Sequence, residues 1–346
     1  MNKEYVIVGY VNHVLSYETI LTFSAGVIGL YTCYSLIEKG VAAKNIEIVA
    51  QHLPGDTSRL YTSPWAGGNF SCISPDDAGT LKYDKFTYTN LGKLFTKLGP
   101  NCGLAKLPTT EMWDFEPSQA KIDSISGYLE NFTIIPEKDL KGKKFGVKYT
   151  TWNFNCPKFI QHFHLYLLLL GVTFTRKSLA SLSEAVSSST MVLFNCSGIG
   201  AHYLTKDEKV FPVRGQVLVI DASHIKENRM VWGTDSATYI IPRPDSTEVV
   251  LGGFVQHGNW SGDTLKTETE DIIKRTTALF PETTNTRVLR VATGLRPYRE
   301  GGVRIEKQSI GSVAIIHNYG AGGYGYQAGL GMADHATALH LDQAKL

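Results

Sequence analysis

The chain has 346 residues, 43% hydrophobic content and a formal net charge of +2, so it is long enough for a large core and about two domains. Its 34 basic and 32 acidic side chains nearly balance, which argues against a nucleic-acid partner, because such a partner needs a clustered excess of Lys and Arg. Five scattered cysteines without a CxxC pair argue against a disulfide framework or a metal site, and the apolar stretches are too short or too interrupted for membrane insertion.

Strand-like and helix-like segments alternate along the first 200 residues. Residues 5–8 read as a short apolar strand, residues 27–39 as a helix and residues 46–50 as a second strand, which is βαβ order. A loop rich in Gly, Pro, Ser and Thr follows at 56–70. Beyond it we predict helices at 76–98, 117–129 and 156–170 and strands at 172–175 and 191–195.

The pattern changes in the second half of the chain. Residues 217–220, 239–242 and 248–254 read as longer strands joined by polar turns, which favours a mixed, largely antiparallel sheet. A helix at 266–279, a strand at 314–317, a glycine-rich turn at 319–326 and a last helix to about residue 341 complete the chain. Because βαβ-like segments occur at both ends and in the middle, we expect an α/β fold with two interleaved domains.

The first candidate motif is Ser24-Ala25-Gly26-Val27-Ile28-Gly29. A dinucleotide site needs a strand, a tight glycine turn and a helix whose first N–H groups face the pyrophosphate. Gly26 would let a phosphate approach the backbone, and Gly29 would let the helix pack closely on the sheet. An ordinary glycine-containing helix start is the alternative. The acid expected after the second strand is absent, and Gln51 stands nearby as a candidate partner for a ribose.

Residues 10–24 interrupt this fingerprint. Joining Gly9 directly to Ala25 gives a strand followed by Gly9-Ala25-Gly26-Val27-Ile28-Gly29, which is a complete GxGxxG. The codons of the intervening residues can spell the splice site GTATGT, the branch point TACTAAC and a terminal TTTAG. We hypothesise that residues 10–24 are a translated, unspliced intron.

Two arrangements of the first strand compete if the insert is present. Tyr5–Val8 can keep the central strand position, with the insert bulging out of the turn. Alternatively, residues 19–23, which are also apolar, replace that strand and leave residues 1–17 as a tail. We favour the second arrangement because it avoids a long loop inside a tight turn. It would place Ser24 at the turn position and weaken dinucleotide binding.

A second motif pairs Gly294-Leu295-Arg296-Pro297 with Tyr239-Ile240-Ile241-Pro242. We place Arg296 after a strand, beside a proline that stiffens the backbone. A guanidinium held in this way can bind a carboxylate through two parallel hydrogen bonds, and a tyrosine hydroxyl can add a third. A surface arginine and a core tyrosine are the alternative interpretation.

Two further motifs lie near the C-terminus. Four glycines occur between His317 and Gln327, before a helix, which favours close approach of the backbone to a ligand over a simple tight turn. The last residues, Ala344-Lys345-Leu346, are similar to the Ser-Lys-Leu peroxisomal address.

Together these motifs resemble the D-amino-acid oxidase family, and most closely its fungal members. The resemblance covers nearly the whole chain and includes several segments in the family's order. They are residues 63–69 (SPWAGGN), 195–198 (NCSG), 213–216 (VRGQ), 239–244 (YIIPRP), 294–297 (GLRP) and 320–327 (GAGGYGYQ). It implies an FAD-binding domain of residues 1–55, 145–200 and 288–346, interleaved with a substrate-binding domain of residues 56–144 and 201–287.

The resemblance also implies a set of cofactor contacts. FAD would lie extended, with its pyrophosphate at the helix that starts near Val27 and its adenine end near the backbone of Leu179. The residues implied to contact FAD are Ala25, Gly26, Val27, Ile28, Gly29, Gln51, Thr57, Ser58, Gly67, Gly68, Asn69, Leu179, Ser197, Gly198, Arg296, Gly322, Gly323, Tyr324, Gly325, Tyr326 and Gln327.

The implied reaction is the oxidative deamination of a D-amino acid. Arg296 and Tyr239 would bind the substrate carboxylate, and the carbonyl of Gly323 would accept a hydrogen bond from the amine. Hydride then passes from Cα to flavin N5, water hydrolyses the imino acid to a keto acid and ammonia, and O₂ is reduced to H₂O₂. No side chain acts as the catalytic base, because the amine lone pair drives the step.

Partners, localisation and rival functions complete these expectations. Residues 344–346 would bind the peroxisomal import receptor and direct the chain to the peroxisome matrix, and a homodimer is expected. One rival function is oxidation of glycine, sarcosine or D-aspartate. A D-aspartate site needs a cation for the side-chain carboxylate, and Arg243 is the candidate. The others are a non-catalytic product whose insert impairs FAD binding, and an NAD(P) dehydrogenase, which would leave the Arg296 and Tyr239 motifs unexplained.

Overall fold

The computed structural model describes residues 5–8, 10–13, 21–58, 61–186, 190–234, 236–311 and 313–341. The chain folds into two compact units built from separate stretches of sequence. Unit 1 comprises Met1–Pro64, Ile160–Val213 and Leu295–Leu346, and unit 2 comprises Trp65–Phe159 and Arg214–Gly294. The chain passes from one unit to the other after Pro64, Phe159, Val213 and Gly294. Each of these boundaries falls somewhat later than the one expected, after residues 55, 144, 200 and 287.

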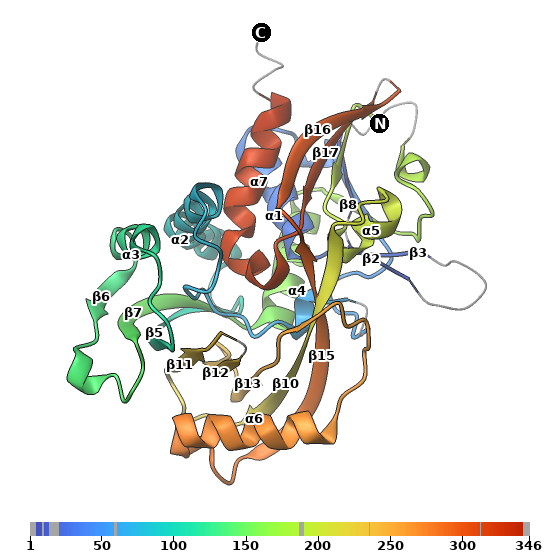
Figure 1. Cartoon of the computed structure of the whole chain (residues 1–346). Coiled ribbons are helices and arrows are strands. Elements are labelled where there is room, and N and C mark those ends of the chain that lie inside the picture. Colours follow the sequence, from blue (N-terminus) through green and yellow to red (C-terminus); the bar gives the residue numbers. More distant parts are fainter. Residues whose placement is uncertain are drawn as a thin grey trace. The chain divides into compact units, whose positions relative to one another are not determined.

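Unit 1 is built on a six-stranded sheet in the order β16-β17-β9-β1-β4-β8. Strands β1, β4, β8, β9 and β17 pair in parallel, and β16 is antiparallel to β17 at one edge. The strands are β1 (Tyr5–Val8), β4 (Ile46–Ala50), β8 (Thr173–Arg176), β9 (Val192–Asn195), β16 (Arg304–Ile310) and β17 (Val313–Tyr319). Helices α1 (Val27–Glu38) and α7 (Gly325–Leu341) lie side by side in this unit (Figure 1).

The central strand position belongs to β1, so our preference for residues 19–23 as the first strand is wrong. Tyr5–Val8 pairs in parallel with both β4 and β9. The described parts of the insert form an antiparallel hairpin of β2 (Tyr10–His13) and β3 (Leu21–Ser24) between β1 and α1. This arrangement is possible because a hairpin brings its two ends together, so the chain returns to α1 without an open loop inside the turn.

Unit 2 is built on a mixed sheet in the order β14-β10-β13-β12-β11-β5-β7-β6, with β15 beside β10. From β10 to β6 the neighbouring strands are antiparallel, except β11 and β5, which are parallel. The strands are β5 (Leu104–Trp113), β6 (Glu130–Ile134), β7 (Phe145–Phe154), β10 (Val210–Asp221), β11 (Asn228–Trp232), β12 (Ala237–Pro242), β13 (Glu248–Gly252), β14 (Gln256–His257) and β15 (Arg287–Arg299). The largely antiparallel sheet confirms the prediction for this part of the chain.

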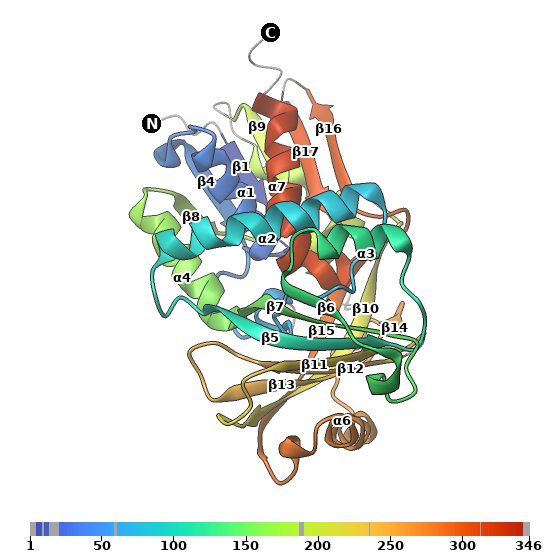
Figure 2. The same ribbon diagram turned by 90° about the vertical axis from the view of Figure 1, so that its left-hand side faces the viewer.

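Helices cover this sheet on both sides. Helix α6 (Lys266–Leu279) packs Ile272 against Leu218, Ile240 and Leu251, which alternate with residues that point to the opposite face. Helices α2 (Ala78–Leu98) and α3 (Gln119–Ser126) lie together on the other side from α6 (Figure 2). The face of the sheet turned away from α6 therefore carries Tyr239 and Ile241.

Apart from α4, the remaining helical elements are short. Three of them belong to unit 1: α5 (Ala201–Leu204), η5 (Gly198–Gly200) and η7 (Gly322–Tyr324). A fourth, η2 (Ser63–Trp65), begins in unit 1, and its last residue belongs to unit 2. Helix α4 (Cys156–Leu169) ends at a left-handed Gly171, as predicted. The other single turns are η1 (Ala43–Asn45), η3 (Glu137–Asp139), η4 (Leu182–Ala185) and η6 (Pro281–Thr283).

Local signals explain why most helices were predicted and several strands were not. Helix α2 starts after Asp77, whose carboxylate accepts the Thr80 N–H at 2.9 Å, and α3 starts after Ser118, which caps Lys121. Strands β5, β7 and β15 escaped prediction. Their sequences place charged and polar residues at buried positions, Glu111 among them, so the period-two pattern is lost.

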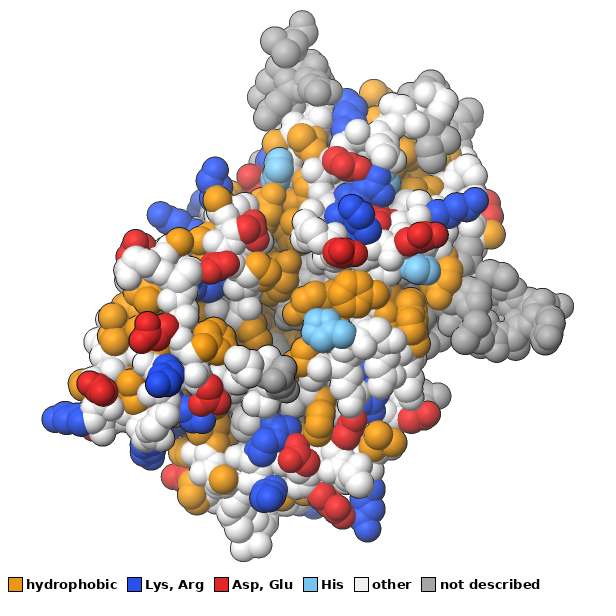
Figure 3. Space-filling model, viewed as in Figure 1, with side chains coloured by type: hydrophobic (Ala, Val, Ile, Leu, Met, Phe, Trp, Pro, Cys, Tyr) orange, Lys and Arg blue, Asp and Glu red, His pale blue; other side chains and the backbone are white. Residues whose placement is uncertain are grey.

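Charged side chains of both signs are scattered over the face shown in Figure 3, without one large patch of a single sign. This distribution fits the nearly balanced composition. Within the described ranges, no helix is long and apolar enough to cross a membrane.

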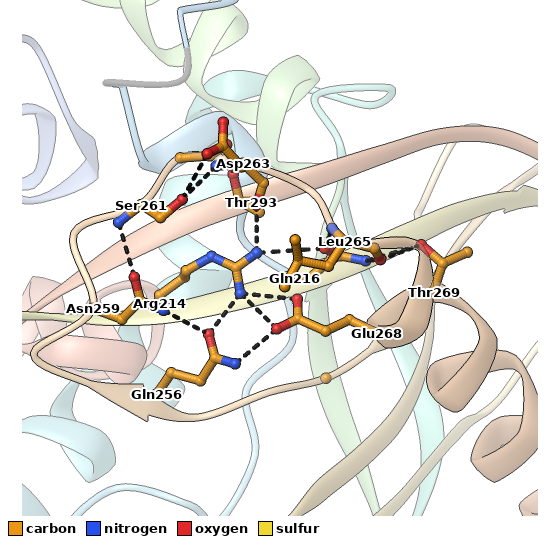
Figure 4. Close-up of polar contacts among 12 residues, drawn as sticks. Arg214, Gln216, Gln256, Asn259, Ser261, Asp263, Leu265, Glu268, Thr269 and Thr293 are labelled. Atoms are coloured by element: carbon orange, nitrogen blue, oxygen red, sulfur yellow. Dashed lines mark hydrogen bonds and ion pairs between the residues drawn. The ribbon is translucent and has the colours of Figure 1, made fainter.

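A buried ion pair fixes the segment that leads into α6. Arg214 on β10 is 1% exposed, and its Nη1 contacts both carboxylate oxygens of Glu268 at 2.9 and 2.8 Å and Gln256 Oε1 at 2.6 Å (Figure 4). Its Nη2 donates to the Asp263 carbonyl. Gln216, two residues along β10, binds the backbone of Leu265 in both directions. The 213–216 motif thus secures residues 256–265 to the sheet.

Candidate active site

The candidate cofactor residues of unit 1 collect at one edge of its parallel sheet. Gln51 follows β4, Ser197 and Gly198 follow β9, and the glycine-rich turn follows β17. Because these strands run in parallel, their carboxyl ends meet at the same edge, which is where ligands bind in open α/β sheets.

The first turn of α1 offers uncapped N–H groups at this edge. Gly26 is the N-cap residue, with extended φ and ψ angles and no side-chain hydrogen bond to the helix. A Cβ added to Gly26 would lie 3.0 Å from Ser63 Oγ, which itself accepts the Val27 N–H at 3.1 Å. The Ile28 and Gly29 N–H groups have no acceptor within the helix. This turn therefore presents donors and a partial positive charge suited to a phosphate.

Two buried side-chain oxygens lack a hydrogen-bond partner within the described residues at the same edge. They are Gln51 Oε1 and Ser197 Oγ. A buried polar atom without a partner is costly, so each oxygen suits a ligand that donates a hydrogen bond. Sugar and ribityl hydroxyls are such donors. The uncapped helix turn and these two oxygens fit a dinucleotide with a pyrophosphate and polyhydroxylated chains.

The glycine-rich turn packs against the strand that carries Arg296. The turn includes Gly322, whose φ of 48° is left-handed and whose added Cβ would lie 2.5 Å from the Tyr298 ring. A Cβ at Gly323 would lie 3.3 Å from Arg296 Cδ. Gly323 and Arg296 are therefore neighbours, as the substrate-binding interpretation requires. Arg296 lies inside β15 and not after a strand, because pairing with β10 extends that strand past Pro297 to Arg299.

The start of α7 meets the α1 turn. Gly325 lies next to Ile28 and Val27, whose side chains would be 3.8 and 4.0 Å from an added Cβ, in ordinary van der Waals contact. Tyr326 donates its hydroxyl to the Ser63 carbonyl at 2.9 Å, and its own carbonyl accepts the Tyr31 hydroxyl. Tyr324 and Gln327 are buried in the same turn. Gly322–Gln327 and Ala25–Gly29 thus form one continuous surface of unit 1.

Tyr239 lies in unit 2, in a space bordered by glycines. Its ring would clash with a side chain at Gly252 or Gly253, where an added Cβ would come within 2.2 and 2.5 Å of it. Gly67 lies across from it, with an added Cβ at 3.6 Å from Tyr239 Cε2. Trp232 borders the ring at a centroid distance of 6.2 Å. The Tyr239 phenol is therefore fixed in position by close backbone approach.

Gly67, Gly68 and Asn69 also lie in unit 2, against β7 and β12. Gly68 has a left-handed φ of 87°, and its carbonyl accepts the Phe154 N–H at 2.6 Å. Asn69 bridges to Asn153 and donates to Met230 Sδ. These three residues are thus brought together with Tyr239.

The other predicted cofactor residues follow β4 and β8. Thr57 and Ser58 lie in the loop after β4, where the Ser58 carbonyl accepts the Tyr61 N–H at 3.0 Å. Leu179 is buried just beyond β8. Ala344-Lys345-Leu346 lie outside the described residues.

Three side chains outside the predicted set of cofactor contacts support this edge. Tyr61 donates its hydroxyl to the Ala25 carbonyl at 2.6 Å, and Ser63 holds the Val27 N–H. Arg176 donates to the Gln51 carbonyl at 2.8 Å and pairs with Asp56 at 2.6 Å. The Arg176 hydrogen bond lowers the pKa of Asp56. No local pattern predicts these contacts, because each joins segments that are distant in sequence.

Arg243, the candidate cation for a D-aspartate side chain, is engaged elsewhere in unit 2. It is 4% exposed, and its Nη1 pairs with Glu248 Oε2 at 2.8 Å. Arg290 pairs with the same carboxylate at 2.7 Å. The charge of Arg243 is therefore compensated within unit 2.

Known proteins resemble this chain over most of its length. A family model described as FAD dependent oxidoreductase matches residues 25–339. The D-amino-acid oxidase of Schizosaccharomyces pombe is 41% identical over 340 residues, which cover 94% of this chain and 97% of that protein. The D-amino-acid oxidase of Fusarium vanettenii is 27% identical over 353 residues, which cover 93% and 96%.

Solved structures share the fold at low sequence identity. Glycine oxidase from Geobacillus kaustophilus superposes with a TM-score of 0.73 at 13% identity, over 98% of this chain and 95% of that one. L-Proline dehydrogenase from P. horikoshii gives 0.74 at 10% identity, over 99% and 94%. The sequence match extends over nearly the full length of both chains, and the uncapped α1 turn fits a dinucleotide. This chain belongs to the D-amino-acid oxidase family of FAD-dependent oxidoreductases.

Proposed function

We propose that this chain oxidises D-amino acids to imino acids, which hydrolyse to keto acids and ammonia, while O₂ is reduced to H₂O₂. The observation that carries this proposal is the 41% identity to a D-amino-acid oxidase across nearly the full length of both chains. The arrangement of Arg296 beside Gly323 supports it, because a guanidinium and a backbone carbonyl are complementary to the two ends of an amino acid.

The chain's own residues bind and orient the substrate. Arg296 binds the α-carboxylate through paired N–H donors, and Tyr239 adds its hydroxyl. The Gly323 carbonyl accepts a hydrogen bond from the amine, which fixes the direction of the Cα–H bond. No side chain is required as a base.

FAD is the cofactor, and when bound it supplies the acceptor for hydride and the route for electrons to O₂. The N–H groups of the α1 turn hold its pyrophosphate. Gln51 and Ser197 accept hydrogen bonds from its hydroxyls, and Thr57, Ser58, Gly67–Asn69 and Leu179 complete its surroundings. Backbone N–H groups in the Gly322–Gln327 turn would offer hydrogen-bond donors to its ring.

The test replaces Arg296 and follows peroxide production from D-alanine. Arg296→Met removes charge-assisted hydrogen bonds to the carboxylate, each contributing about 1.5–3 kcal/mol, so we expect KM for D-alanine to rise by about tenfold or more. Arg287→Met is the matched control, because Arg287 is on the same strand but exposed, and its pair with Asp221 contributes little.

Comparison of D-alanine with D-aspartate and sarcosine separates the rival functions. Faster oxidation of either alternative by the wild-type chain, or an unchanged KM in the Arg296 variant, would contradict the proposal. Protein purified without flavin absorbance would favour the non-catalytic alternative.

We propose further that the chain is imported into the peroxisome matrix through Ala344-Lys345-Leu346. The support is the similarity of these residues to a peroxisomal address, together with the expected release of peroxide. Deleting the three residues and following a fluorescent fusion tests the import; unchanged peroxisomal location would refute it.

A further inference from the structure

Glu111 is a buried carboxylate that the proposed reaction does not use. It lies on β5 and is 0% exposed. Oε1 accepts hydrogen bonds from the Trp232 indole Nε1 and from the Cys72 backbone N–H at 3.1 Å. Oε2 accepts the Tyr149 hydroxyl and lies 3.2 Å from the same Cys72 nitrogen. Within the described residues, its hydrogen bonds come from three separate segments, and no ion pair compensates its charge.

Burial raises the pKa of Glu111, while the hydrogen bonds from Tyr149 and Trp232 oppose that rise. A buried carboxylate without a cation contributes poorly to stability. A more specific role is to fix the groups that donate to it.

Those groups surround Tyr239. Glu111, Met230, Tyr239 and Gly252 pair in turn across β5, β11, β12 and β13, so they stand in one row on one face of the sheet. Residues opposite one another point to the same face. Trp232 lies two residues beyond Met230 on that face, and its ring is tilted by 42° to that of Tyr239.

Glu111 also contacts the chain segment that lies against Tyr239 at Gly67. Cys72, whose backbone N–H donates to Glu111, is the last residue of the Gly67–Cys72 segment. Gly67, at the start of this segment, packs on Ile241 and Tyr239. One carboxylate therefore holds both the indole and the backbone segment that border the Tyr239 ring.

We propose that Glu111 is a positioning residue that sets the geometry of Tyr239 through Trp232 and the Gly67–Cys72 segment. This inference rests on the proposed function, in which Tyr239 binds the substrate carboxylate. Loss of the carboxylate frees the indole and shifts the border of the site, which weakens substrate binding more than it slows the chemical step.

The experiment compares two replacements of similar size. In Glu111→Met no acceptor remains for the indole, and we expect KM for D-alanine to rise about tenfold with a smaller change in kcat. In Glu111→Gln the amide oxygen can still accept the indole N–H while the Tyr149 hydroxyl turns to accept from the amide nitrogen. We therefore expect this variant to restore KM to within about threefold of wild type.

Tyr149→Phe is the control, because it removes another donor from the same carboxylate without touching Tyr239. We expect it to lower thermal stability but to leave KM unchanged. In the Trp232→Phe background, Glu111→Met should raise KM less than it does in the wild-type background, because, of the contacts that act on Tyr239, only the one with the Cys72 backbone remains to be lost. Bound flavin per chain should stay at the wild-type level in every variant.

An unchanged KM in folded Glu111→Met, or an equal rise in Tyr149→Phe, would overturn the inference. If Glu111→Met does not fold, the comparison of Trp232→Phe with Tyr149→Phe decides: a raised KM only in the former supports positioning, and equal KM values refute it. Wild-type protein that does not oxidise D-alanine would instead refute the proposed function, which keeps the two failures distinct.

Discussion

His317 on β17 is buried as a neutral imidazole in unit 1. It is 1% exposed, and its Nδ1 and Nε2 lie 3.1 Å from the Asn195 amide nitrogen and the Gln308 side-chain oxygen. An imidazole protonated only at Nε2 satisfies both partners. Burial, with a smaller contribution from Arg304, lowers the pKa of His317 to about 4.

This depressed pKa makes stability depend on pH. Between about pH 6.5 and pH 4 the unfolded chain binds a proton that the folded chain excludes, so stability falls as the pH falls through this range. We expect about 2 kcal/mol of stability to be lost between pH 7 and pH 5 through this group. Urea unfolding of His317→Gln at both pH values should show a smaller difference than wild type. His224→Gln, which changes an exposed histidine, should keep the wild-type difference.

At the scale of elements, α6 is joined to the sheet by a buried pair as well as by apolar packing. Arg214 and Glu268 are 1% and 6% exposed, and Gln256 donates to the same carboxylate. Arg275, further along α6, donates to the Ala237 and Gly253 carbonyls at 2.7 and 3.0 Å beside Tyr239. The helix therefore determines where the β12 and β13 ends lie.

Glu268→Gln should destabilise the protein by about 3–5 kcal/mol, because it leaves the buried Arg214 guanidinium without a compensating charge. Glu270→Gln on the same helix is the control, since Glu270 and its partner Lys266 are exposed. Denaturant midpoints measure both changes. Equal midpoints for the two variants would show that the buried pair is dispensable.

At the scale of the whole molecule, the insert separates the first strand from the fingerprint. The family match begins at Ala25, the residue directly after the insert, and leaves β1 outside it. The hairpin of β2 and β3 lies near η5, α5 and β4, at the sheet edge where the cofactor residues collect. A hairpin at this edge replaces the single turn glycine that would otherwise lead into α1.

Deletion of residues 10–24 joins Gly9 to Ala25 and completes the glycine turn. We expect FAD affinity to rise by about tenfold or more, because the turn regains close approach to the pyrophosphate. Flavin absorbance per mole of chain and peroxide production from D-alanine measure the effect. A Gly/Ser linker of the same length in place of the insert should not restore binding.

Equal flavin content with and without the insert would show that the hairpin is harmless. The origin of the insert is tested separately by sequencing the transcript. A spliced message that still encodes these residues would exclude the retained-intron hypothesis.

The sequence by itself determined the family, the βαβ order of residues 5–50, the helices with clear caps and the largely antiparallel sheet in the second half of the chain. These depend on local signals such as Asp77, Gly26 and Gly171, whose effects reach only a few residues.

Only the tertiary structure decided which segment is the central strand, that Arg296 lies inside β15, and that Arg243 is paired with Glu248. It alone brought Glu111, Trp232 and Tyr239 into one row. Strand pairing and buried charge compensation join residues far apart in the chain, so no local pattern of the sequence encodes them.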